Sequence, residues 1–146
     1  MQVRRATRDD LPRIMKLERE SPTAAHWVAT HYGSILAAPG GPRVVLVAED
    51  QSVVGFLIAH DIAGEWEIEN VLVAREFQRR GLASELLRTF LDIVLPGGTD
   101  SIFLEVRESN QAARSLYEKS GFIQTGRRSR YYRDPTEDAI LYKLSV

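Results

Sequence analysis

A six-residue segment, 78–83, carries the clearest chemical signal in this sequence. It reads Gln-Arg-Arg-Gly-Leu-Ala and stands between an apolar stretch that ends at Val73 and a run with helical periodicity. A strand that leads through a glycine turn into a helix presents the unpaired N–H groups of the first helical turn, which bind phosphate or pyrophosphate. Gly81 removes the Cβ that would obstruct the main chain, and Arg79 and Arg80 add positive charge. The segment therefore predicts a binding site for a phosphate-bearing ligand.

The common nucleotide-binding patterns do not explain this segment. Neither Gly-x-x-x-x-Gly-Lys nor Gly-x-Gly-x-x-Gly occurs in the sequence, which argues against a P-loop and a Rossmann fingerprint. We therefore expect a phosphate-bearing cofactor of another kind.

Composition narrows the class of protein. The chain has 146 residues, 44% of them hydrophobic, which suits one domain spanning residues 1–146. Nineteen basic residues against 20 acidic ones give no electrostatic argument for binding nucleic acid or a membrane surface. Cysteine is absent, and His26, His31 and His60 are not spaced as metal ligands, so we expect no metal. No apolar run approaches a signal core or a membrane span, and we expect a cytoplasmic protein.

The elements that would position the segment follow from hydrophobic periodicity. Strands are predicted at 3–6, 43–49, 52–61, 66–73, 101–107, 122–128 and 139–144. Helices are predicted after a Thr7–Asp10 capping box, at 23–38, at 82–95 and at 110–120. This order predicts an α/β domain with a mixed sheet, with no internal repeat and no linker.

Two motifs, in order along the chain, resemble those of the GNAT acyltransferases. Residues 78–83 match the pattern Gln/Arg-x-x-Gly-x-Gly/Ala, and residues 110–122 match Asn-x-x-Ala-x-x-Leu-Tyr-x-x-x-Gly-Phe. Residues 104–107, 130–132 and 137–139 resemble the branch that acetylates protein N-termini, especially the RimI-type ribosomal-protein alanine acetyltransferases. The resemblance spans roughly residues 66–144.

The resemblance implies a GNAT fold, with a central mixed twisted sheet of about six to seven strands flanked by about four helices. It also implies acetyl-CoA as donor, with its pyrophosphate on the backbone of residues 79–84 and the thioester oxygen on main-chain N–H groups at a bulge around Leu72 or Val73. The implied cofactor-binding residues are Val71, Leu72, Val73, Gln78, Arg79, Arg80, Gly81, Leu82, Ala83, Ser84, Asn110, Ala113 and Tyr117.

Asn110, Ala113 and Tyr117 share one face of a predicted helix over about two turns, roughly 10 Å, a suitable length for lining part of an extended pantetheine. Asn110 is also a favourable helix N-cap, and Tyr117 is also a plausible core aromatic. The resemblance implies that Tyr117 hydrogen-bonds the departing CoA thiolate. Protonation by a phenol is uphill by about 1.5 pKa units, so hydrogen bonding in the transition state is the safer expectation.

Glu105 stands in an otherwise apolar strand, where it either faces solvent or acts as a base. An acceptor α-amine has a reference pKa near 8 and must lose a proton before it attacks, and a carboxylate can receive that proton directly or through water. The resemblance gives Glu105 this role, and Glu69 on the preceding strand is the second candidate.

The acceptor side of the site is expected at Tyr131 and Tyr132, with Glu69 and Asn70. In the family branch that this segment resembles, tyrosine hydroxyls of a hairpin hold the backbone of the substrate peptide. By themselves, the two tyrosines could equally be aromatic residues at a strand end.

The predicted function is transfer of acetyl from acetyl-CoA to the N-terminal α-amino group of a protein or peptide, with a ribosomal protein that begins with alanine as one such acceptor. The reaction would be direct attack in a ternary complex, on a monomer or weak homodimer without direct nucleic-acid or membrane contact. Two alternatives remain open. The first is a GNAT enzyme for a small-molecule amine, and the second is a non-catalytic acyl-CoA-binding regulatory module.

Overall fold

The computed structural model describes residues 1–21 and 42–146. Its centre is a seven-stranded sheet with the strand order β1-β2-β3-β4-β5-β7-β6. The strands are β1 (Gln2–Arg5), β2 (Arg43–Asp50), β3 (Ser52–Ile62), β4 (Glu65–Val73), β5 (Ser101–Arg107), β6 (Ile123–Tyr132) and β7 (Glu137–Ser145). The described α-helices are α1 (Leu11–Glu20), α3 (Leu82–Val94) and α4 (Gln111–Lys119), and three 3-10 turns are η1 (Arg8–Asp10), η2 (Arg75–Phe77) and η3 (Leu95–Gly97). The predicted mixed α/β fold is confirmed, while the predicted helix at 23–38 lies outside the described residues.

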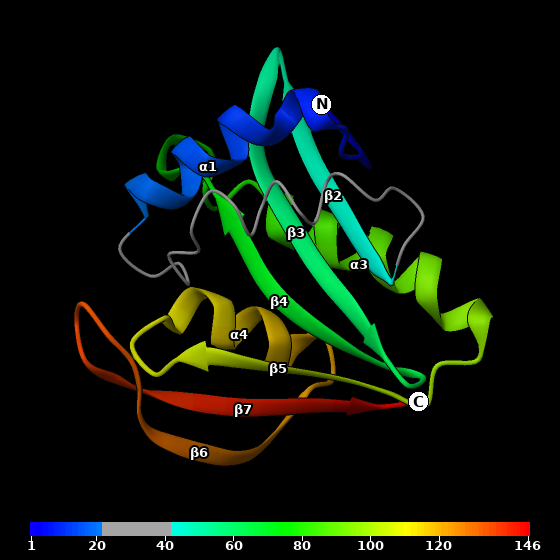
Figure 1. The fold of residues 1–146 in the computed structure, drawn as a ribbon, viewed down its shortest axis with the longest axis vertical. Helices are drawn as coiled ribbons and strands as arrows, with labels where there is room; N and C mark the ends of the chain where they lie inside the picture. Colours follow the sequence, from blue (N-terminus) through cyan, green and yellow to red (C-terminus); the bar gives the residue numbers. More distant parts are fainter. Residues whose placement is uncertain (22–41) are drawn as a thin grey trace.

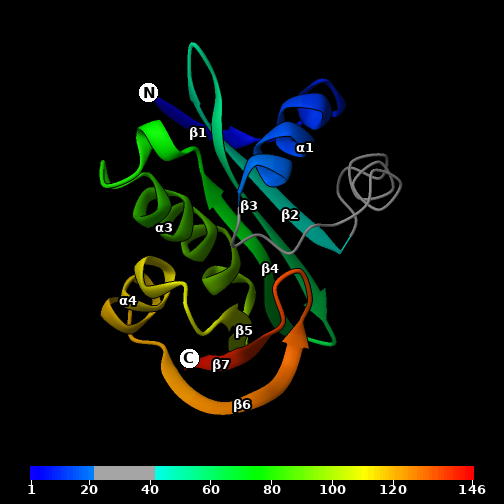
Figure 2. The same ribbon diagram turned by 90° about the vertical axis from the view of Figure 1, so that its left-hand side faces the viewer.

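The sheet is covered on both faces, as Figure 2 shows, with α1 on one face and α3 and α4 on the other. Leu86 and Phe90 of α3 pack with Leu46 and Leu57 of the sheet in one core cluster. Ile14 of α1 packs in a second cluster with strand residues whose side chains point to the other face of the sheet. Because strand side chains alternate between faces, β2, β3 and β4 each contribute to both clusters.

Among the described residues, β4 and β5 form the one parallel pair of this sheet, and the pairing is short. Residues 65–68 of β4 pair with residues 101–104 of β5, and the ladder between the two strands ends there. In Figure 1 the two strands lie together at one end and are separated at the other. This split exposes backbone groups of β4 that a regular sheet would have paired.

A β-bulge in β4 falls at Glu69. Asn70 is opposite Ile58 and Ile68 is opposite Ala59, which leaves Glu69 without a direct partner on β3. The bulge changes which face each side chain takes, because Ile68 and Val71 both contact the cluster that contains α3. The bulge predicted around Leu72 or Val73 is therefore wrong, since both residues pair regularly with β3.

Strand β6 is longer than predicted. It continues past Arg128 to Tyr132, with a register irregularity against β7 between these residues. Its side chains are mostly exposed on both faces, so the alternation of apolar and polar residues that marks a half-buried strand is missing here. The turn of the hairpin that carries Tyr131 and Tyr132 therefore begins later in the chain than the hydrophobic pattern predicts.

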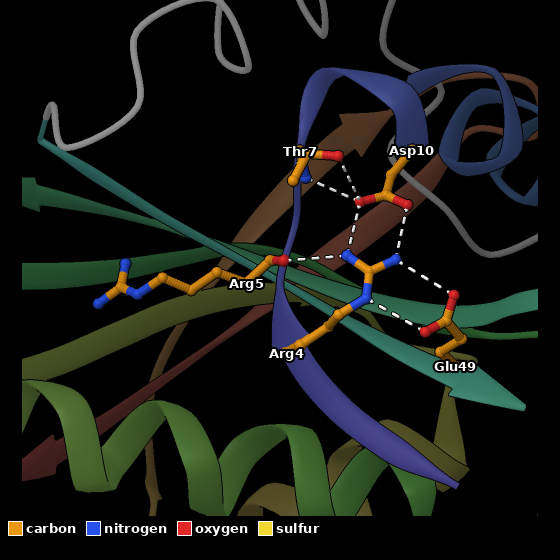
Figure 3. A network of polar contacts seen from close by, with 5 residues as sticks. All are labelled: Arg4, Arg5, Thr7, Asp10 and Glu49. Atoms are coloured by element: carbon orange, nitrogen blue, oxygen red, sulfur yellow. Dashed lines mark hydrogen bonds and ion pairs between the residues drawn. The ribbon is translucent and has the colours of Figure 1, made fainter.

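A polar network fixes the start of the chain to the sheet (Figure 3). Arg4 of β1 donates to both carboxylate oxygens of Asp10 at 2.9 and 3.0 Å, and its Nε donates to Glu49 of β2 at 3.2 Å. The backbone N–H of Thr7 donates to Asp10 at 2.7 Å, and the predicted Thr7–Asp10 capping box is confirmed. One arginine thus joins β1, β2 and the turn that leads into α1.

Candidate active site

A pocket opens at the split between β4 and β5. The predicted site residues that line it are Glu69, Asn70, Val71, Glu105, Asn110, Ala113, Tyr117 and Tyr132, and the residues not predicted are Ile68, Val106 and Arg107. These residues come from β4, β5, α4 and β6 together with the segment before α4. Residues from two strands, a helix and a hairpin therefore converge on one pocket.

The split presents backbone donors of β4 to the pocket side. The N–H of Ala74 donates to Val54 of β3 at 2.7 Å, and backbone direction alternates along a strand, so Val71 and Val73 turn their N–H groups away from β3. Pairing with β5 has ended before these residues. The N–H of Leu72 points to the β3 side by the same alternation. Val71 and Val73 are therefore the residues of this set whose N–H groups can meet a ligand.

The predicted phosphate-binding segment lies at the N-terminus of α3. Gly81 is the N-cap with φ of 79°, no side chain of the described residues caps this helix end, and a Cβ at Gly81 would meet no described atom within 4 Å. The first N–H groups of the helix, at Leu82, Ala83 and Ser84, therefore have no capping side chain among those residues. Arg79 also has a positive φ, of 64°. This arrangement fits a phosphate or pyrophosphate held by main chain.

Two side chains of this segment make contacts within the protein. The side-chain amide of Gln78 donates to the carbonyl of Val73 at 3.0 Å, which fixes the turn between β4 and α3. Arg80 lies over the ring of Phe77, with 5.1 Å between the guanidinium carbon and the ring centre. Leu82 is buried in the core, so only its backbone can face a ligand.

Helix α4 forms the opposite wall of the pocket. The side chain of Asn110 accepts a hydrogen bond from the N–H of Ala113 at 3.2 Å, so Asn110 is both the N-cap of α4 and a pocket residue. Arg114 turns away from the pocket and donates to the hydroxyl of Tyr142 at 3.1 Å. Tyr142 in turn donates to Glu118 at 2.6 Å, which holds α4 against β7.

Tyr117 is only 4% exposed and packs against the rings of Phe122 and Tyr142, with centroids 5.5 and 6.2 Å away. Tyr117 therefore belongs to the core and also lines the pocket. Burial raises the pKa of its hydroxyl well above the ordinary value, and the charge of Tyr132 adds to this. The hydroxyl is consequently a hydrogen-bond donor over the whole physiological pH range.

Three carboxylates gather on β4 and β5. Glu105 pairs with Arg128 at 2.9 Å, and Glu69 pairs with Arg43 at 2.9 Å; the two carboxylate side chains are 15% and 11% exposed. Glu67 forms no ion pair with any residue in the described ranges. Burial raises the pKa of the Glu67 carboxyl, and the charges of Glu69 and Glu105 raise it further.

The β6–β7 hairpin closes the pocket beside these carboxylates. Tyr131 and Tyr132 contact each other edge to face, with centroids 5.1 Å apart, and only Tyr132 lines the pocket. Burial raises the pKa of the Tyr131 hydroxyl, and a hydrogen bond with Glu105 contributes. Burial followed by the charge of Glu105 raises the pKa of Tyr132 well above its usual range. Glu105 thus lies beside both hairpin tyrosines.

Arg107 is the pocket residue that sequence reasoning missed most plainly. It is 2% exposed and lines the pocket, and its guanidinium lies over the ring of Tyr132 at 4.5 Å. An arginine at a strand end is usually exposed, and only the hairpin folded over it makes this one buried. In the sequence, Arg107 stood out only as the last residue of the Leu-Glu-Val-Arg segment, residues 104–107.

Two further properties concern the described part of the chain alone. Among residues 1–21 and 42–146, no three His, Asp or Glu side chains are grouped so that they could hold a metal ion. No helix in those same ranges is long and apolar enough to cross a membrane.

Comparison with known proteins defines the class first. The fold matches the crystal structure of the ribosomal-protein-S18-alanine N-acetyltransferase from Escherichia coli with a TM-score of 0.85 and 29% identity, covering 99% of this chain and 93% of that chain. The fold of this chain is thus shared with an N-acetyltransferase.

The sequence comparisons identify the family. The model of the acetyltransferase (GNAT) family matches residues 6–122. The chain is 34% identical over 144 residues to the ribosomal protein bS18-alanine N-acetyltransferase of Salmonella typhimurium, over 94% of this chain and 92% of that protein. It is 31% identical over 139 residues to the enzyme of the same name from Haemophilus ducreyi, over 92% and 93% of the two chains. This chain belongs to the GNAT acetyltransferase family and is an acetyl-CoA-dependent N-acetyltransferase.

Proposed function

We propose that this enzyme acetylates the N-terminal α-amino group of a protein or peptide, and that a ribosomal protein beginning with alanine is the first acceptor to test. The relatives at 31% and 34% identity are named for acetylation of the alanine of ribosomal protein bS18. Since that substrate is ribosomal, we expect a cytoplasmic location. The observation that carries the proposal is a pocket at the β4–β5 split, lined by the carboxylates Glu69 and Glu105 and by Tyr132 of the hairpin, in a fold that also carries the N-terminus of α3 at Gly81.

The donor side of this pocket has the groups that acetyl-CoA needs. The N–H groups at the start of α3 would hold its pyrophosphate, and the N–H groups of Val71 and Val73 face the gap where a thioester oxygen would be stabilised. When bound, acetyl-CoA supplies an acetyl thioester whose C–S bond breaks as the new C–N amide bond forms. Asn110 and Ala113 would line the path of its pantetheine.

The acceptor side has groups that can manage the proton of the incoming amine. In our proposal Glu105 receives that proton, directly or through water, and Glu69 is the alternative base. Tyr117 donates a hydrogen bond to the departing sulfur, which its high pKa permits at neutral pH. Tyr131 and Tyr132 hold the backbone of the acceptor peptide beside the base.

A peptide library tests the proposal most broadly. Acetyl transfer from acetyl-CoA to peptides varied at their first four residues would be read by mass spectrometry, beside a panel of polyamines and amino sugars. We expect acetylation of α-amines with a preference at the first residue. Turnover of the small amines without any peptide would overturn the proposal, and binding of CoA without transfer to any amine would indicate a regulatory module.

A further inference from the structure

Arg107 ends β5 at the edge of the pocket, and its burial requires an explanation. Its side chain is 2% exposed, although a guanidinium is always charged and is costly to bury without partners. The groups that satisfy it therefore indicate what it does. They belong almost entirely to the turn between β6 and β7.

The two terminal nitrogens of Arg107 hold the carbonyls of that turn. One donates to the carbonyl of Pro135 at 2.9 Å, and the other donates to the carbonyl of Arg133 at 3.0 Å. Glu137, the first residue of β7, lies 3.4 Å from the same guanidinium. A guanidinium presents its donors from separate nitrogens in a fixed planar fork, whereas a lysine presents all three of its donors from one nitrogen.

The flat face of the same guanidinium covers Tyr132, the hairpin tyrosine that lines the pocket, at 4.5 Å from the ring centre. The Nε of Arg107 is buried and has no hydrogen-bond partner in the part of the chain that the structure describes. This side chain therefore contacts the hairpin by two hydrogen bonds to backbone carbonyls, by its ion pair with Glu137 and by one stacked ring, and it also forms part of the pocket wall.

The backbone around Arg107 links the hairpin to the donor wall. Its carbonyl accepts a hydrogen bond from the N–H of Asn110 at 3.0 Å, and Asn110 caps α4. The carboxylate of Glu137 accepts from the N–H of Ser109 at 2.5 Å. The hairpin turn is thus attached to the segment that joins β5 to α4, with Arg107 at the junction.

We propose that Arg107 is a positioning residue that holds the β6–β7 hairpin, and Tyr132 with it, at the acceptor side of the pocket. This inference rests on the proposed function, since it assumes that the hairpin binds the acceptor. Arg107 does not contact the acceptor's reacting amine in this scheme. It positions the residues that contact the acceptor.

The kinetic test compares Arg107→Lys and Arg107→Met with Arg88→Met, which removes an exposed arginine of α3 whose side chain is 68% exposed. Both Arg107 variants should raise the KM for an acceptor peptide tenfold or more, while the Kd of acetyl-CoA by calorimetry stays within about threefold. Arg88→Met should change neither. An equal rise in the acceptor KM and the acetyl-CoA Kd, or no change in the acceptor KM, would overturn the proposal.

Hydrogen exchange gives a readout that does not depend on turnover. Arg107→Lys should speed amide exchange at least tenfold in residues 129–137 and leave the amides of α3 unchanged. If the wild-type enzyme acetylates no peptide, the proposed function fails, while this exchange pattern still decides whether Arg107 holds the hairpin. Should both Arg107 variants fail to fold, Tyr132→Leu removes the stacked ring from the other side. Faster exchange in the same residues would then support the proposal, and unchanged exchange would refute it.

Discussion

At Glu105 the proposed base is also an ion-pair partner, because its carboxylate pairs with Arg128 at 2.9 Å. A structural role and a catalytic role therefore predict different results for the two partners. A base at this position serves the amine, which near its reference pKa of about 8 is largely protonated at neutral pH. A purely structural carboxylate would only hold Arg128 and the hydroxyl of Tyr131 in place.

Glu105→Gln should lower kcat by about 10²-fold or more, the range expected for loss of a general base, with the largest loss at low pH. Arg128→Met leaves the carboxylate in place and should cost much less. Steady-state rates from pH 6 to 9, with acetyl-CoA affinity measured separately, would check this. Equal losses in the two variants would show that the ion pair, and not proton transfer, accounts for the effect, and the same measurement on Glu69→Gln ranks the second candidate.

Tyr117→Phe removes one hydroxyl and keeps the ring that packs against Phe122. A hydrogen bond to a charged group contributes about 1.5 to 3 kcal/mol, so we expect kcat to fall about tenfold to 150-fold. The Kd for CoA should change little, because the hydroxyl acts on the departing sulfur. Since burial raises the pKa of this hydroxyl, ionisation of Tyr117 should produce no loss of activity between pH 6 and 9. An unchanged kcat for the variant would exclude this role.

At the scale of elements, the start of α3 was predictable and the split beside it was not. Gly81 and the helical period after it marked the helix N-terminus in the letters alone. The position at which β4 leaves β5 depends on what packs between the strands, and both strands carry apolar and polar residues on either side of that point. The sequence also predicted the bulge at the wrong place, around Leu72 or Val73 and not at Glu69. A bulge changes which face of the sheet each side chain takes without changing the composition of the strand.

The hairpin shows a second limit of sequence patterns. Its tyrosines were found through the resemblance of residues 130–132, while hydrophobic alternation ended the strand at Arg128. Arg107 was missed because its burial results from contacts with residues 26 to 30 positions later in the chain. Local periodicity carries no information about such contacts.

Gly81→Ala tests the α3 N-terminus with a matched control. Gly81 and Gly98 have almost the same positive φ, 79° and 81°, and a Cβ would meet no atom within 4 Å at either position. Each alanine should therefore destabilise the fold by a similar amount, about 1 to 2 kcal/mol, through backbone strain alone. Only Gly81→Ala should also weaken acetyl-CoA binding, because its Cβ would enter the space beside the helix N–H groups. Thermal unfolding and calorimetry measure the two effects, and equal acetyl-CoA affinities in both variants would contradict the assignment.

At the scale of the whole molecule, stability depends on the network that ties β1 to β2 and η1. Burial alone would raise the pKa of the Asp10 carboxyl, but the hydrogen bonds from Arg4 and Thr7 outweigh it, so the pKa lies below the usual 3.8. A carboxyl whose pKa is lower in the folded state stabilises the fold above its unfolded pKa. That contribution is lost as the pH falls through the folded value.

Asp10→Asn should therefore reduce the free energy of unfolding at pH 7 by about 1 to 3 kcal/mol, because it weakens hydrogen bonds to a charged group. The difference from the wild type should shrink as the pH falls below about 4, where the wild-type carboxyl becomes protonated. Asp9→Asn changes the exposed neighbour in the same turn and serves as the control. Urea unfolding at pH 7 and pH 3 checks the sign, and a difference that grows at low pH would show that the network does not act through the ionised carboxylate.

The choice of amine is tested most directly by one peptide pair. Both peptides begin with alanine and contain one internal lysine, and in one of them the α-amino group is blocked. Mass spectrometry after incubation with acetyl-CoA should locate the acetyl group on the α-nitrogen of the free peptide and find the blocked peptide unchanged. Acetylation of the lysine at equal rates in both peptides would contradict the proposed specificity for protein N-termini.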